Sequence, residues 1–158
     1  MRRSLCLCEP HVAFAGQEDT WKFIYTTATT VRKGAKLKFD LLTKGRDIDW
    51  DIPSVSPKKK GNVIYGYCDA KKKVVAAREV KAADSLVPQY EFVLPCDIKS
   101  GETFTICIGA ASGASNTAEK SRCQTTLQRR RSFLLYIDAK GDGNYDDPEI
   151  FNMDIRGG

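Results

Sequence analysis

Histidine is nearly absent from this sequence, and its cysteines lack the spacing of a metal or redox motif. The single histidine, His11, lies close to the N-terminus. Nucleophilic catalysis by serine or cysteine needs a positioned base, and histidine is the usual one. No CxxC spacing occurs, so a zinc site would need an unusual cysteine-rich ligand set. We therefore expect a protein that is not an enzyme and has no catalytic residues.

Long apolar runs and strong charge of one sign are also missing. No apolar run approaches the roughly 18 residues that indicate a membrane-spanning helix, so no membrane partner is predicted. The start of the chain, MRRSLCLCEP, is broken at Glu9 and Pro10 and is too short to be the apolar region of a signal peptide. A net charge of +5 is mildly basic, and nucleic acid is not an expected partner.

Six cysteines occur, without the dense spacing of a small disulfide scaffold: Cys6, Cys8, Cys68, Cys96, Cys107 and Cys123. At 158 residues and 42% hydrophobic content, the chain is long enough to bury a core without such cross-links. Buried free thiols are the favoured interpretation, and one or more disulfides the alternative.

Apolar residues recur at every second position throughout the chain, which is the pattern of half-buried strands. Trp21, Phe23 and Tyr25 form one such set, and the others are Leu37-Phe39-Leu41, Val63-Tyr65-Tyr67, Tyr90-Phe92-Leu94, Phe104-Ile106-Ile108, Phe133-Leu135-Ile137 and Phe151-Met153-Ile155. Several such strands predict an all-β, two-sheet antiparallel β-sandwich, Ig-like or jelly-roll-like. We expect residues 16–158 to form this single domain and residues 1–15 to be an N-terminal arm.

Other segments are less clear. Residues Val74 to Leu86 contain good helix formers and fit either a short helix or an edge strand. Residues 46–61 are expected on the surface, and the Gly/Ser-rich residues 110–121 are expected to be mobile. VRKGAKLKFDL (31–41) and IKSGETFTICI (98–108) align without gaps. We interpret them as two hairpins that use glycine for the same turn, and an internal duplication is the alternative.

The stretch IDAKGDGNYDDPEIF (137–151) resembles a calcium loop. Counting from Asp138, oxygen-bearing residues fall at four later ligand positions of an EF-type loop, with Gly143 at the turn: Asp142, Asn144, Asp146 and Glu149. Lys140 stands where the second ligand belongs, and a strand pattern follows in place of a helix. The loop is therefore either a weak Ca²⁺ site or a structural acidic turn, with Lys140 as an internal counter-ion.

Aromatic residues beside basic runs raise a second possibility. Two triple-lysine runs, residues 58–60 and 71–73, flank a strand that carries Tyr65 and Tyr67, and Trp50 lies in a loop. These three aromatic residues could stack on the sugars of an anionic glycan. The alternative is that the lysines are solvated strand ends and both tyrosines lie in the core.

Several segments together resemble a known bacterial sequence type: AGQEDTWKFIY, VRKGAKLKF, DWDIPS and the late CQTTLQRRRSFLLYIDAKGDGNYDDPEIFNMDIRGG. They are similar to the β-sandwich segment of a family of uncharacterised bacterial proteins. In that family the segment precedes a region predicted to be a metal-dependent, phosphoesterase-like hydrolase. The resemblance implies a scaffold or recognition domain attached to an enzyme, with no catalytic residue of its own.

Two hypotheses follow. The first is a non-catalytic accessory domain that packs on a neighbouring domain of a longer protein. The second is a carbohydrate-binding module.

Overall fold

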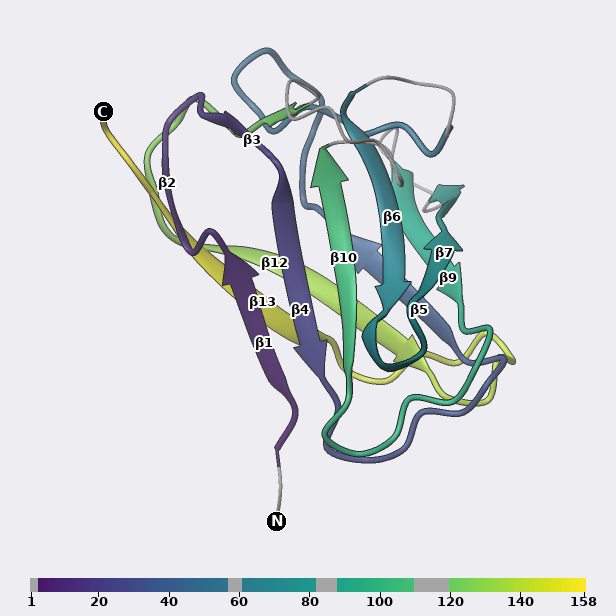
Figure 1. Ribbon diagram of the computed structural model, residues 1–158. Helices are drawn as coiled ribbons and strands as arrows, with labels where there is room; N and C mark the ends of the chain where they lie inside the picture. The colour runs from purple at the N-terminus through teal and green to yellow at the C-terminus, as the bar shows by residue number, and fades with distance from the viewer. Residues whose placement is uncertain (1–2, 57–60, 82–87, 110–119) are drawn as a thin grey trace.

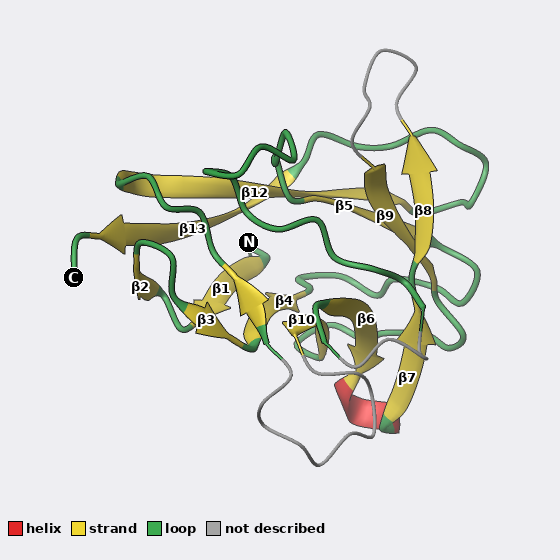
Figure 2. Ribbon diagram, turned by 90° about the horizontal axis from the view of Figure 1, so that it is seen from above, coloured by secondary structure: helices red, strands yellow, loops and turns green. Residues whose placement is uncertain are grey.

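The computed structural model describes residues 3–56, 61–81, 88–109 and 120–158. Within these ranges the chain is built from β-strands, with a single 3-10 turn, η1 (Asp69–Lys71). Two large sheets pack face to face, as Figures 1 and 2 show from two directions. The predicted all-β sandwich is confirmed.

One sheet has five strands in the order β1 (Leu5–Glu9), β4 (Trp21–Thr26), β10 (Thr103–Gly109), β6 (Val63–Cys68) and β7 (Lys73–Ala76). The other has six, in the order β2 (Val12–Phe14), β13 (Glu149–Arg156), β12 (Gln128–Asp138), β5 (Lys36–Asp40), β9 (Pro88–Val93) and β8 (Arg78–Lys81). β3 (Glu18–Asp19) and β11 (Ser121–Arg122) form a separate short pair. Because β2 runs parallel to β13, the six-stranded sheet is mixed rather than wholly antiparallel.

Aromatic rings from both sheets fill the space between them. Phe23, from the five-stranded sheet, lies 4.6 Å from Phe133, 4.9 Å from Phe39 and 5.7 Å from Phe151, all three from the six-stranded sheet. These four side chains are fully buried. The inward positions are the ones that the period-2 pattern predicted for these strands, because alternate side chains of a strand point to opposite faces.

Residues 73–81 form two edge strands rather than a helix. β7 ends the five-stranded sheet and β8 ends the six-stranded one, so the chain passes from one sheet to the other at the buried Ala77. Packing in the sandwich overrides the helix propensity of this alanine-rich stretch. The remainder of the ambiguous segment, from residue 82, lies outside the described residues.

The N-terminal segment requires a correction. Residues 1–15 were expected to be an arm outside the sandwich, but β1 pairs with β4 in one sheet and β2 pairs with β13 in the other. Cys8 and Ala13 point into the core. The period-2 pattern did not indicate these strands because small residues, rather than aromatic or branched ones, occupy their inward positions.

The internal repeat corresponds to two connections that cross between the sheets, not to hairpins. Residues 27–35 join β4 to β5, and residues 94–102 join β9 to β10. The two connections meet where Val31 and Ile98 exchange backbone hydrogen bonds of 2.8 Å in each direction. Gly34 and Gly101 occupy equivalent turns at φ angles of 90° and 87°, a conformation that favours glycine, as the sequence predicted.

Candidate functional site

The outer face of the five-stranded sheet presents a row of side chains that crosses all five strands. Cross-strand register aligns Leu7, Ile24, Thr105, Tyr67 and Val74 in that order. The next row holds Glu9, Lys22, Cys107, Tyr65 and Ala76. Directly paired residues share a face of the sheet, and the positions between them are buried in the core. We call this surface the tyrosine face.

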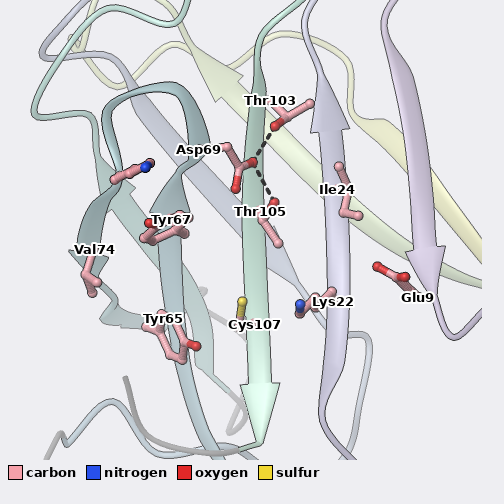
Figure 3. A pocket seen from close by; sticks show the side chains of 11 residues that line it. Glu9, Lys22, Ile24, Tyr65, Tyr67, Asp69, Val74, Thr103, Thr105 and Cys107 are labelled. Carbon is pink, nitrogen blue, oxygen red and sulfur yellow. Dashed lines mark hydrogen bonds between the residues drawn. The ribbon is translucent and has the colours of Figure 1, made fainter. Parts of the chain in front are cut away.

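A pocket of about 680 Å³ lies on the tyrosine face (Figure 3). Thr105 and Cys107 of the central strand β10 are buried beneath the flanking side chains and form its floor. Tyr65 and Tyr67 line it from β6, and Val74 lines it from β7. The pocket therefore combines aromatic and aliphatic walls with a polar floor.

Asp69 fixes the polar end of the pocket. Its carboxylate accepts hydrogen bonds from the hydroxyl groups of Thr103 and Thr105, the latter at 2.8 Å (Figure 3). Asp69 lies in η1 directly after β6, so the turn that ends this strand places the carboxylate over β10. This arrangement leaves further carboxylate lone pairs that could accept hydrogen bonds from a ligand or a partner.

The charge around the pocket is balanced: Lys22 and Lys72 line it together with Glu9 and Asp69. Burial, and then the neighbouring Cys107, raise the pKa of Tyr65 to about 12. Burial also raises the pKa of the Cys107 thiol above its ordinary value. Both groups are therefore protonated at neutral pH, which makes Tyr65 a hydrogen-bond donor and leaves Cys107 a poor nucleophile.

One interpretation of the sequence placed Tyr65 and Tyr67 in the core. In the structure they lie on the outer face of β6. Ile64, Gly66 and Cys68 point inward, whereas Tyr65 and Tyr67 are half-buried on the outer face. The sequence was ambiguous because apolar residues occupy both faces of this strand. Alternating threonines on the neighbouring β10, Thr103 and Thr105, are the sequence signal that marks the outer face.

Trp50 is not brought together with the two tyrosines. Its ring is fully buried, 4.9 Å from Trp21 and 5.4 Å from Phe133, measured between ring centroids. Its indole N–H has no hydrogen-bond partner among the described residues. A ring with no exposed face cannot stack on a sugar in this conformation. The expectation that residues 46–61 lie on the surface therefore fails at Trp50. Arg122 holds this loop against the molecule by donating hydrogen bonds to the backbone carbonyls of Asp47 and Asp49 and to the carboxylate of Asp51.

Backbone amides contact the first carboxylate of the acidic loop. Asp138 is fully buried and accepts hydrogen bonds from the backbone N–H groups of Gly143 at 2.7 Å and Asp142 at 3.2 Å. Asp142 in turn accepts one from the Asn144 N–H, which lowers the pKa of Asp142. No ion pair within 4 Å joins Lys140 to a carboxylate among the described residues.

The candidate calcium ligands remain a prediction. Of the residues that the structure describes, no three His, Cys, Asp or Glu side chains converge as a metal-binding group. The loop is a turn between β12 and β13 whose polar groups bind its own backbone. The two amides leave further lone pairs on the Asp138 carboxylate. Calcium would still need other carboxylates of the loop, such as Asp146 and Glu149, to move toward it.

The six cysteines are all free thiols in the structure. Burial raises the pKa of Cys6, Cys8 and Cys68 to about 12. Thiolate is the reactive form, so these thiols are poor nucleophiles at neutral pH. They contribute to packing: Cys8, Cys68 and Cys123 belong to the core.

Two expectations concern segments outside the described residues. The first triple-lysine run falls at residues 58–60, and most of the segment expected to be mobile falls at 110–119. In the described part of the chain, none of the helical structure is long and apolar enough to cross a membrane.

Comparison with known proteins links the chain to a segment of longer bacterial proteins. It is 44% identical to an uncharacterised protein of Chlamydia muridarum (strain MoPn / Nigg), 43% to one of Chlamydia pneumoniae and 44% to one of Chlamydia trachomatis serovar D. Each match covers 99% of this chain but only 25% of the relative, so the chain spans about a quarter of the length of the curated relatives it matches. No protein-family model matches it.

Proposed function

We propose that this chain is a non-catalytic accessory domain that docks onto a neighbouring domain through the tyrosine face. The observation that carries the proposal is a set of exposed apolar side chains on the outer face of the five-stranded sheet. Leu5, Leu7 and Val74 are 64%, 56% and 51% exposed. Apolar side chains that gather on one exposed face are a recognised feature of protein interaction sites.

The relatives supply a candidate occupant. In each Chlamydia protein about three quarters of the polypeptide lies outside the segment that matches this chain. We infer that a domain from that remaining region covers the tyrosine face. The family resemblance supports a phosphoesterase-like hydrolase as this neighbour, which this chain would position rather than assist chemically.

The composition of the face supports a docking role. Half-buried Tyr65 and Tyr67 supply large contact area with few rotatable bonds, and tyrosine is enriched in the buried centres of interfaces. Lys22, Glu9 and Asp69 surround them with charges of both signs, as expected of a polar rim that sets orientation.

Hydrogen exchange tests this proposal. The chain would be measured by itself and fused to the remaining three quarters of the Chlamydia trachomatis relative. Docking predicts slower exchange in β1 and β7 of the fusion, and its loss when Leu7→Lys and Val74→Lys are combined. Ile150→Lys is the matched control, because Ile150 is 51% exposed but lies on the six-stranded sheet. Equal exchange rates with and without the additional region would overturn the proposal.

A second candidate, binding of an anionic glycan, is favoured by the position of the two tyrosines at the mouth of the same pocket. Their rings could stack on sugars while Lys22 and Lys72 attract carboxylate or sulfate groups and Asp69 accepts sugar hydroxyls. Tyr67→Ala should abolish retention on an array of acidic oligosaccharides, whereas Ile150→Ala should not. A blank array across acidic and neutral glycans would exclude this function.

A further inference from the structure

An arginine occupies a core-facing position near the start of the long strand β12. Arg131 alternates with Phe133 and Leu135, which point into the sandwich, and only 4% of its surface is exposed. A bulge between Gln128 and Arg131, with Arg130 in the left-handed region at φ 50°, shifts the register and turns the side chain inward. The preceding Arg129 and Arg130 are exposed.

The contacts of Arg131 are all neutral. Its Nε donates to Oε1 of Gln124 at 3.0 Å, and its two terminal nitrogens donate to the backbone carbonyls of Ser132 at 2.6 Å and Leu42 at 3.2 Å. The guanidinium lies 4.2 Å above the ring of Phe133. A guanidinium carries five N–H donors, so these bonds leave two for another acceptor.

The charge of Arg131 therefore has no contacting counter-ion among the described residues. The ion pairs within 4 Å involve Arg46, Arg78, Arg122 and Arg156 instead. Burial lowers the pKa of Arg131 to about 10, which still leaves the group charged at neutral pH. A buried, unpaired charge is unfavourable, and the aromatic ring offsets only part of this.

A small pocket of about 250 Å³ opens onto this guanidinium. Its lining comes from the loop after β5, the segment before β12 and the first residues of β12, and includes Lys44, Arg46 and Asp49. Asp49 is paired with Arg46 at 2.9 Å. Asp40 and Asp49 attract the charge of Arg131 from a longer range, so Lys44 and Arg131 remain the cations without a contacting carboxylate in this pocket. The polar groups of Gln124 and Ser132 complete the wall.

We propose that this pocket binds a small oxyanion, a carboxylate, phosphate or sulfate group, with Arg131 at its base and Lys44 at its mouth. An arginine fork matches the paired oxygens of these groups. The volume suits a group of a few atoms rather than a whole drug-sized ligand. The pocket shares no lining residue with the tyrosine face, so the inference stands independently of the docking proposal.

The test titrates sodium phosphate, sulfate and acetate into the chain, with sodium chloride at matched ionic strength as the reference. The melting temperature and amide chemical shifts are followed. We expect a saturable response to at least one oxyanion, with shifts centred on residues 42–49 and 124–132. The three salts separate tetrahedral from carboxylate recognition.

Variants locate the site. Lys44→Glu should weaken the response at least tenfold, whereas Lys33→Glu, at an exposed lysine that does not line the pocket, should leave it unchanged. Arg131→Lys, if it folds, should bind more weakly because it lacks the fork. A response no larger than that to chloride, one that survives Lys44→Glu, or one that both lysine variants weaken equally would overturn the proposal.

Discussion

Gly66 lies at the centre of β6, on the side of the strand that meets the core, and its lack of a side chain makes room for two phenylalanine rings. A Cβ placed on Gly66 would lie 2.9 Å from Cδ1 of Phe92 and closer still to Cζ of Phe104. These rings pack against each other with centroids 5.5 Å apart. We therefore predict that Gly66→Ala destabilises the protein by overpacking.

The magnitude follows from two opposing effects. An extra methyl in a filled core typically costs roughly 1–3 kcal/mol. Gly66 does not have the positive φ that would strain an alanine, so the substitution recovers about 0.4–1 kcal/mol by restricting the unfolded chain. The expected net loss of unfolding free energy is about 1–2 kcal/mol. For a domain of this length, that lowers Tm by roughly 2–8 °C.

Urea denaturation and thermal melting of four proteins provide the assay: the wild type, Gly66→Ala, Phe104→Leu and the double variant. Phe104→Leu removes part of the ring that the new methyl would strike. The double variant should therefore lose less stability than the sum of the two single losses, with a coupling energy of about 0.5–2 kcal/mol. Two results would refute the argument that Gly66 sets which face of β6 meets the core. One is a Gly66→Ala protein as stable as the wild type, and the other is strictly additive losses of unfolding free energy in the double variant.

Three further predictions concern other parts of the molecule. Hydrogen bonds from Arg46 lower the pKa of Asp49 from its ordinary 3.8 to about 2. The stabilising contribution of the Asp49 carboxylate is therefore complete above about pH 4 and is lost as the pH falls toward 2. Over this interval the Tm of Asp49→Asn should decline less than that of the wild type. Millimolar calcium should leave the melting curve of metal-stripped protein unchanged, because no three acidic side chains among the described residues converge in this loop. A rise in Tm that disappears in Asp142→Asn would contradict this and indicate an ion site. Trp50→Ala should cost about 3–5 kcal/mol in urea denaturation because a large buried side chain is lost, and a variant of wild-type stability would argue against its place in the core.

The sequence was sufficient to predict the all-β class and most of the core. Strand β5, for example, carries the apolar Leu37 and Phe39 on one face and the charged Lys36, Lys38 and Asp40 on the other. A half-buried sheet imposes that period-2 pattern whatever the order of its strands. The positive φ at Gly34 and Gly101 was also predictable, because that turn geometry favours glycine in any tertiary setting.

Only the tertiary structure decided which face of an ambiguous strand is buried and which distant residues meet. In β6 the choice depends on the fit of Phe92 and Phe104 over Gly66, so it cannot be read from β6 alone. From the sequence, Trp50 was interpreted as an exposed aromatic residue in a loop. In the structure, Trp21 and Phe133 enclose its ring. Arg131 follows two exposed arginines in the sequence, and it lies in the core only because of the bulge in β12. In each case the determining contacts come from other strands and loops, and a local sequence pattern carries no information about them.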